Sequence, residues 1–166
     1  MYGARPAWLD DPLLHETFTP MEIKKLENPK VPPDAPQRWA AGPVPRNVMR
    51  IKAAGVRIGI GGDIGGISGG GGYFGWSSHM EMAGLVKAGF TPAEAITVAT
   101  RNSAEIFGLD QLGTIAAGKS ADFIVLNANP TDDIANTRRI ATVYLRGKEV
   151  NRPALRAKWT GRTPSH

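Results

Sequence analysis

The sequence predicts an α/β protein, in which helices alternate with strands, and three observations carry this expectation. A helix-type spacing of apolar residues ends at Gly55 and gives way to an alternating apolar segment, Val56–Ile60. Glycine then dominates residues 59–75, where ten of seventeen positions are glycine. Beyond Gly108 the pattern changes to short strands separated by turns. Helix, glycine and strand in succession are typical of folds in which helices connect parallel strands.

The composition is that of an ordinary folded chain. Its 166 residues correspond to about one domain, and 42% of them are hydrophobic and 21% charged. Because the chain has no cysteine, disulfides, thiolate metal sites and cysteine nucleophiles are excluded. No apolar stretch approaches the ~18–20 residues of a membrane span, and Met1–Asp10 lacks the pattern of a signal peptide. The compartment stays unknown from the sequence.

The first 44 residues are expected to form an irregular, proline-rich segment. Prolines recur throughout it, and each one fixes φ and removes an amide donor. A short helix is expected only near Met21–Leu26. Residues 1–44 are therefore predicted to wrap over the rest of the chain as a long loop.

Residues 45–108 carry the main α/β pattern. A helix is expected at Asn47–Ala54, followed by the strand Val56–Ile60 and by a mobile glycine-rich loop. A second helix is expected at about Ser78–Ala88, because apolar residues recur there on one face and a glycine follows.

Capping residues predict two further helices in this region. Thr91 and Glu94 have the spacing of a capping box, with proline at the first helical position, and indicate a helix towards Thr100. Asn102 is expected to cap a short last helix that ends at Phe107.

Residues 109–152 are expected to form a small β domain. Gly113–Ile115 and Asp122–Leu126 have the pattern of short strands. Ile140–Leu145 and Glu149–Val150 flank a glycine-containing turn and predict a hairpin. A basic tail, residues 153–166, completes the chain. After position 137 the only acidic residue is Glu149, whereas eight residues are basic: Arg138, Arg139, Arg146, Lys148, Arg152, Arg156, Lys158 and Arg162.

One glycine motif and this basic tail leave an alternative function open. Gly113–Ser120 fits the P-loop pattern. Gly70-x-Gly72-x-x-Gly75 also fits a dinucleotide fingerprint, but such a match is nearly inevitable in so glycine-rich a run, and the predicted strand ends too early for it. A P-loop needs a helix after its lysine, whereas a strand is expected after Ser120, so a Gly-Lys turn between strands accounts better for the first motif. The alternative is a small nucleotide-binding module using Gly113–Ser120, or a polyanion-binding module using the basic tail.

Asp63 is the leading candidate for a catalytic residue. It directly follows the predicted strand and precedes the glycine-rich loop, a position in which α/β folds place catalytic groups. A turn residue is an equally good interpretation of a Gly-Asp pair. His79 and Glu81 begin the next helix, but side chains two residues apart on a helix do not face each other, so the pair alone is a weak signal.

Four sequence blocks resemble one known family. They are AAGVRIGIGGD at residues 53–63, HMEM with the following AGFTPAEAI and ATRNSAE in residues 79–105, LGTIAAGKSADFIVL at 112–126, and VYLRGKEV at 143–150. In this order they are similar to the C-terminal portion of the metal-dependent amidohydrolase superfamily, and in particular to its imidazolonepropionase- and prolidase-like members. The resemblance spans about residues 47–152.

The resemblance implies a fold and an activity. Members fold as a (β/α)8 TIM barrel with a small β-sandwich, and this chain would supply the last barrel strand, the following helices and part of the β-sandwich. They hydrolyse carbon–nitrogen bonds of small amides, cyclic amides or dipeptides. Asp63 would bind the metal and act as general base and acid. Tyr73, Trp76 and His79 would lie on the substrate side.

The resemblance also implies that the site is incomplete in this chain. Members hold a divalent metal, commonly zinc, through a His-x-His pair and further histidines; the histidines here are His15, His79 and His166. One carboxylate does not hold zinc usefully, since zinc takes three or four protein ligands. We therefore expect an incomplete barrel that is inactive alone, that needs the missing barrel portion or oligomerises, and that involves no nucleic acid and no membrane span.

Overall fold

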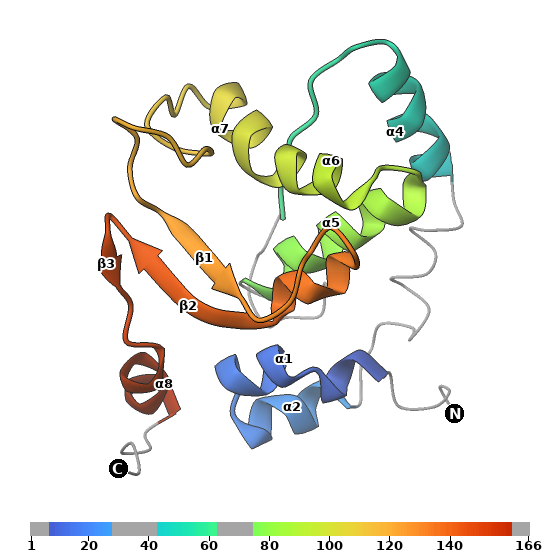
Figure 1. The fold of residues 1–166 in the computed structure, drawn as a ribbon. Coiled ribbons are helices and arrows are strands. Elements are labelled where there is room, and N and C mark those ends of the chain that lie inside the picture. Colours follow the sequence, from blue (N-terminus) through green and yellow to red (C-terminus); the bar gives the residue numbers. More distant parts are fainter. Residues whose placement is uncertain (1–6, 28–42, 63–74, 161–166) are drawn as a thin grey trace.

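The structure, a computed structural model, describes residues 7–27, 43–62 and 75–160. In chain order its elements are η1 (Ala7–Asp10), α1 (Pro12–Thr17), α2 (Pro20–Leu26), α4 (Pro43–Ala53), α5 (Trp76–Ala88), α6 (Pro92–Thr97), the π-helical turn η2 (Val98–Asn102), α7 (Ser103–Ile106), β1 (Phe123–Leu126), η3 (Ile134–Arg138), β2 (Ile140–Leu145), β3 (Lys148–Glu149) and α8 (Arg152–Thr160). In Figure 1, α4 to α7 lie above the sheet, and α1, α2 and α8 lie below it.

The N-terminal segment contains more helix than the sequence predicts. The short helix expected near Met21 is present as α2, but α1 and η1 precede it. Pro12 and Pro20 occupy the first turn of α1 and α2, with Asp11 and Thr19 as their N-caps. Proline is well suited to this position, because the first helical amides have no partner within the helix. The expectation of an irregular segment is therefore wrong for these residues: their prolines begin helices.

The helix expected at Asn47–Ala54 is present as α4, which begins four residues earlier. Gly55 ends it with φ of 72°, and the amide of Val56 donates to the carbonyl of Ile51 at 3.2 Å. This is the Schellman arrangement, for which glycine is preferred because φ is positive. The chain then turns back along α6 and α7 (Figure 1).

Residues 56–62, which we call the exit segment, do not form the strand that alternation predicts. They belong to no strand of the described sheet. Apolar alternation suits a strand only where a neighbouring strand offers its backbone. Among the described residues, the amides of Ile60 and Gly61 are bonded to side chains of helices. The expected strand is thus replaced by a segment that helices hold.

Helix α5 and the helical run after it largely follow the prediction. Thr91 and Glu94 form the expected capping box, with Pro92 in the first turn. The expected cap at Asn102 is wrong, because its backbone is helical and its side chain makes no capping bond. Helix α6 instead continues through the π-helical turn into α7.

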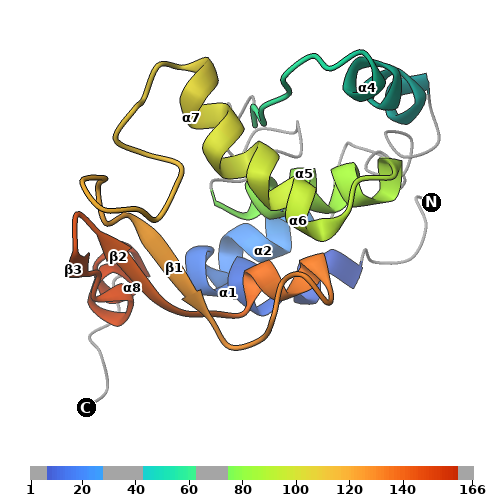
Figure 2. The same ribbon diagram turned by 45° about the horizontal axis from the view of Figure 1, so that its top comes forward.

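The sheet has three antiparallel strands in the order β1-β2-β3. Leu145 pairs with Lys148, and the two turn residues between them, Arg146 and Gly147, have φ of 51° and 73°. Two positive φ values are typical of a type I′ hairpin turn, as the sequence predicts. The strand expected at Gly113–Ile115 is absent; these residues lie in the loop that returns from α7 to β1 (Figure 2).

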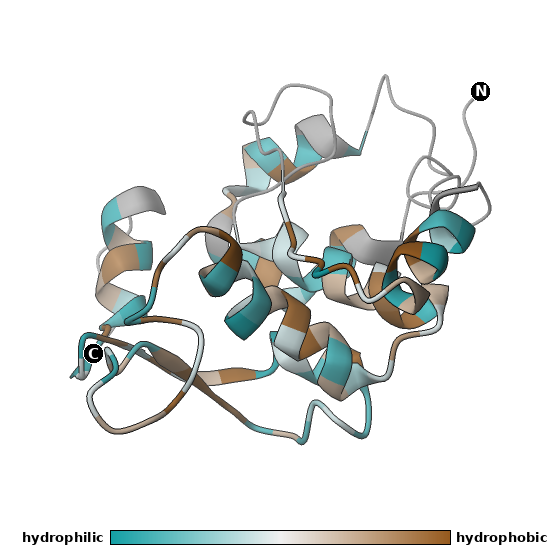
Figure 3. Ribbon diagram, turned by 90° about the horizontal axis from the view of Figure 1, so that it is seen from above, coloured by the Kyte–Doolittle hydropathy of each residue, from teal (hydrophilic) through white to brown (hydrophobic). Residues whose placement is uncertain are grey.

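Two hydrophobic clusters anchor the described residues. One joins the N-terminal helices to the start of α5, and the other joins α5 and α6 to η3. Their buried members are Leu9, Leu14, Ile23 and Trp76 in the first and Met82, Ala95 and Ile134 in the second. No residue of the sheet is fully buried, and hydrophobic residues appear along its strands at the edge of the molecule in Figure 3.

The basic tail begins as helix α8, which packs on the N-terminal region. The guanidinium of Arg152 donates to the carbonyl of Ile140 at 3.0 Å and to the carboxylate of Glu16. Arg156 donates to the carbonyl of His15 at 3.1 Å. Part of the positive charge near the C-terminus therefore serves internal contacts.

Candidate functional site

The candidate site lies where the exit segment leads towards Asp63. The amide of Ile60 donates to Oγ of Ser103 at 3.1 Å, and the amide of Gly61 donates to Oε2 of Glu81 at 3.1 Å. Asp63 and Tyr73 lie outside the described residues. The structure thus describes how the chain is held up to Gly62, directly before the predicted catalytic carboxylate.

Ser103 is positioned by the irregular turn of its helix. Its hydroxyl donates to the carbonyl of Val98, five residues earlier, at 2.8 Å, and accepts from Ile60. Gly59 lies so close that a Cβ there would meet Oγ of Ser103 and Cδ1 of Ile106, each at 3.0 Å. Only a residue without a side chain allows this close approach without shifting its neighbours.

His79 lies on a different side of α5 from Glu81. Its Nδ1 is 3.0 Å from Oγ1 of Thr137, whose hydroxyl donates to the carbonyl of Ile134. Since a threonine hydroxyl has one proton to give, His79 Nδ1–H is the donor. Burial, and next the positive charge of Arg138, lower the pKa of His79, while Asp11 opposes the shift. The His79 ring thus contacts η3, and among the described residues no contact with the exit segment supports the substrate-side role expected for it.

Trp76 also differs from its expected place. Its side chain is only 5% exposed and belongs to the cluster of Leu9, Leu14 and Ile23. An aromatic side chain of this size contributes mainly by burial. The structure thus places Trp76, which is expected on the substrate side, in the core at the start of α5.

Glu81 is the residue that sequence reasoning missed. The sequence indicates only a weak His-x-Glu pair, because residues two apart on a helix point in different directions. The structure agrees with that geometry: His79 contacts η3, whereas Glu81 contacts Gly61. The sequence shows a carboxylate, Glu81, in the helix that follows the glycine-rich loop. No pattern in the sequence, however, relates Glu81 to Gly61.

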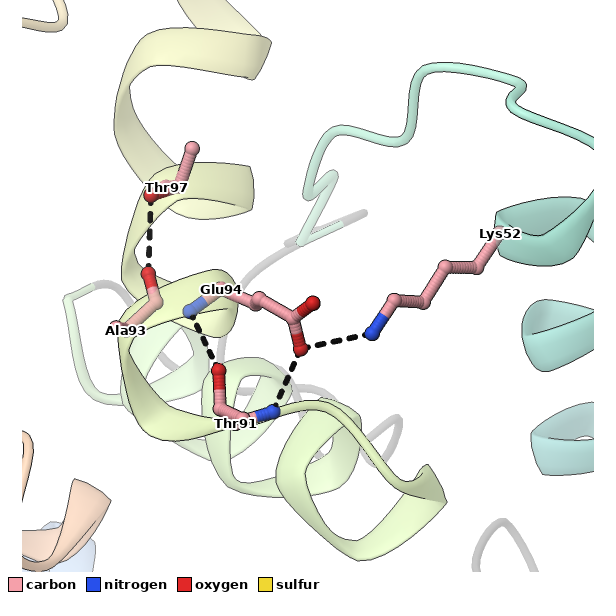
Figure 4. Close-up of polar contacts among 5 residues, drawn as sticks. All are labelled: Lys52, Thr91, Ala93, Glu94 and Thr97. Atoms are coloured by element: carbon pink, nitrogen blue, oxygen red, sulfur yellow. Dashed lines mark hydrogen bonds and ion pairs between the residues drawn. The ribbon is translucent and has the colours of Figure 1, made fainter.

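A groove of about 350 Å³ runs between the exit segment and α6 with η2, lined in part by Val56, Ile58 and Val98. At its rim, Nζ of Lys52 contacts Oε2 of Glu94 at 2.7 Å (Figure 4) and lies 4.4 Å from the ring centre of Phe90. The hydrogen bond from Lys52, followed by that from the backbone of Thr91, lowers the pKa of Glu94. At this rim the charges of Lys52 and Glu94 are therefore paired with each other.

The described residues do not supply a metal centre. No three of their histidine, aspartate and glutamate side chains gather closely enough to hold an ion, whereas zinc takes three or four protein ligands. The donor set therefore does not fit a metal within residues 7–27, 43–62 and 75–160. Among the described helices, none has both the length and the apolar character that crossing a membrane requires.

The loop containing Gly113–Ser120 has a structural role. A Cβ on Gly113 would lie 2.7 Å from Cβ of Ala104, so this glycine allows the loop to pack on α7. The amide of Lys119 donates to Ala116 and that of Ser120 to Gln111. A P-loop instead offers its amides to phosphate at the start of a helix, and here β1 follows. This geometry favours the interpretation as a turn between elements.

Comparison with known proteins identifies the family to which this chain belongs. Residues 23–150 match the model of the Amidohydrolase family. Because this match covers most of the chain, the protein belongs to the amidohydrolase family. That assignment confirms the resemblance drawn from the motifs, and the family is generally dependent on divalent metals.

Three relatives illustrate the extent of the match. Imidazolonepropionase of Deinococcus radiodurans is 37% identical over 79 residues, which cover 45% of this chain and 20% of that protein. Adenine deaminase 1 of Carboxydothermus hydrogenoformans is 37% identical over 76 residues, covering 45% of this chain and 12% of that protein. The solved structure of molinate hydrolase matches with a TM-score of 0.63 at 28% identity, covering 73% of this chain and 31% of that one. The chain thus spans less than a third of each relative.

Proposed function

We propose that this protein takes part in the metal-dependent hydrolysis of a carbon–nitrogen bond in a small amide, cyclic amide or dipeptide. Family membership and relatives named imidazolonepropionase, adenine deaminase and molinate hydrolase support this reaction class. The observation that carries the proposal is the anchoring of two consecutive amides, those of Ile60 and Gly61, which lie three and two residues before Asp63.

Asp63 is the proposed catalytic residue. Its carboxylate would accept the proton of the attacking water and return it to the departing amine, acting as general base and then as general acid. Asp63 is also the proposed metal ligand of this chain, with zinc as the proposed metal. The described residues do not complete a metal site, so the other ligands are proposed to come from further polypeptide.

We propose that this further polypeptide completes a (β/α)8 barrel and a β-sandwich around the chain. Three features support the proposal. The exit segment has no strand neighbour among the described residues, no residue of the sheet is fully buried, and Phe107 and Ile115 are 71% and 85% exposed. The proposed strands would cover these apolar side chains, and burial of apolar surface would favour their association. Without the additional strands, the chain is proposed to be inactive.

Co-expression tests the proposal. The chain is produced alone and together with the polypeptide encoded upstream of Met1, and bound zinc and hydrolysis of amide, cyclic amide and dipeptide substrates are measured. We expect stoichiometric zinc and activity only in the combined preparation, and loss of activity with Asp63→Asn. Equal zinc content and equal activity for the chain alone and the combined preparation would contradict it, as would full activity of the Asp63→Asn variant.

A further inference from the structure

We propose that Glu81 and Ser103 are positioning residues that together fix the path by which the chain leaves the exit segment. The role of this path in catalysis rests on the function proposed for Asp63. The hydrogen bonds themselves do not depend on it, because they are made by described residues before that carboxylate.

The two side chains hold neighbouring amides from different helices. Glu81 extends from α5 and accepts from Gly61, whereas Ser103 begins α7 and accepts from Ile60, in each case at 3.1 Å. A polypeptide segment outside a sheet has no ladder to hold its amides. Here two side-chain oxygens take the place of the carbonyls that a neighbouring strand would offer.

The direction of the Ser103 hydroxyl is determined by its helix. A serine hydroxyl has one proton and two lone pairs, and its proton is directed to the carbonyl of Val98 at 2.8 Å. A lone pair is therefore left for the amide of Ile60. The π-helical turn η2 brings Ser103 opposite Val98 in this way, and such turns occur frequently at functional sites.

Close packing restricts the same segment one residue earlier. A Cβ on Gly59 would meet Ser103 and Ile106 at 3.0 Å, so the backbone of the exit segment lies directly against α7. Contact at Gly59 and hydrogen bonds at Ile60 and Gly61 together constrain three successive residues. A catalytic group that follows such a constrained segment needs less reorganisation to reach its working position.

Amide hydrogen exchange of the ¹⁵N-labelled full chain, measured by NMR, tests the hydrogen bonds without any need for activity. We expect Glu81→Ala to speed exchange at Gly61 about tenfold, the effect of losing a hydrogen bond to a charged group. Glu81→Gln retains an acceptor oxygen but loses the charge, so it should speed exchange at Gly61 less than Glu81→Ala does. Ser103→Ala should speed exchange at Ile60 by a similar factor.

Two variants serve as matched controls. Glu105→Ala removes a carboxylate that also faces the exit segment, but through the Arg57 side chain at 3.4 Å. Thr100→Val removes a hydroxyl that donates to a helix carbonyl, as Ser103 does, without contacting the exit segment. Neither should change exchange at Ile60 or Gly61. An unchanged Gly61 rate in Glu81→Ala, or an equal increase in Glu105→Ala, would overturn the inference.

The combined preparation described above tests the consequence for catalysis. Glu81→Ala should lower kcat at least tenfold with KM nearly unchanged, and Glu81→Gln should restore most of kcat, because the substitution affects only the placement of another group. An unchanged kcat in Glu81→Ala would overturn the positioning role. An inactive wild-type preparation would instead overturn the proposed function, and the exchange rates would still decide whether the two side chains hold the amides.

Discussion

Replacing Gly113 by alanine should destabilise the fold far more than the same change at Gly118. Both glycines have a positive φ, 83° and 80°. A Cβ on Gly113 would lie 2.7 Å from Cβ of Ala104, 2.9 Å from Cα of Arg101 and 3.0 Å from the carbonyl oxygen of Thr100, whereas one on Gly118 would meet nothing within 4 Å. The two positions therefore share backbone strain and differ in packing.

The expected magnitudes follow from this difference. Alanine in the left-handed region costs about 1–2 kcal/mol at either position. Overpacking of a filled site adds about 1–3 kcal/mol. The free energy of unfolding should thus fall by about 2–5 kcal/mol for Gly113→Ala and by about 1–2 kcal/mol for Gly118→Ala. The effect of alanine on the unfolded chain is common to both variants and cancels in the comparison.

Urea unfolding followed by circular dichroism measures both free energies of unfolding. Equal destabilisation by Gly113→Ala and Gly118→Ala would refute the packing argument.

ATP titration tests the function of the same loop. We expect no saturable ATP binding by the wild type. Micromolar ATP binding that is lost in Lys119→Ala would favour a phosphate-binding role for this loop.

Three further outcomes are expected. Burial holds the pKa of His79 below its ordinary value, so the unfolded chain takes up this proton more readily than the folded chain. The free energy of unfolding should therefore decrease as the pH is lowered from about 7.5 to about 5.5. The urea midpoint of His79→Gln should decrease less over the same range. Lys52→Met should lower Tm more at about 0.05 M than at about 1 M salt, because it removes the ammonium group that pairs with Glu94 and lies over the Phe90 ring. An equal drop at both salt concentrations would contradict this. Thr91→Ala should cost about 1 kcal/mol in urea unfolding by removing an N-cap, and Thr91→Ser should retain most of the stability.

Local signals predicted the elements whose chemistry is contained in a few neighbouring residues. The capping box at Thr91 and the hairpin turn at Gly147 each need only a short stretch of sequence, and both are present. Proline is a less direct signal. Its effect depends on whether it lies inside a helix or in the first turn, and Pro12 and Pro20 begin helices in a segment that is expected to be irregular.

The candidate site was only partly predictable, because its contacts join residues distant in sequence. Asp63 could be selected from its place after an apolar segment, but the contact between Glu81 and Gly61 spans 20 residues and depends on how α5 packs. The substrate-side positions expected for His79 and Trp76 come from the family resemblance and from their place next to the glycine-rich loop. The structure gives them partners in η3 and the hydrophobic core because their positions on α5 face those elements.

The widened turn η2 has a consequence for insertions and deletions in this family member. Deleting one of residues 98–102 would turn the i→i+5 repeat of this turn into the ordinary i→i+4 repeat. The widened turn uses one more residue to cover nearly the same angle, so the helix after it would keep almost the same orientation, with Ser103 still directed at Ile60. The same deletion inside the regular helix α5 would rotate the residues after it by about 100° around the helix axis. The turn is therefore the place in these helices where one residue can be lost with the least disturbance.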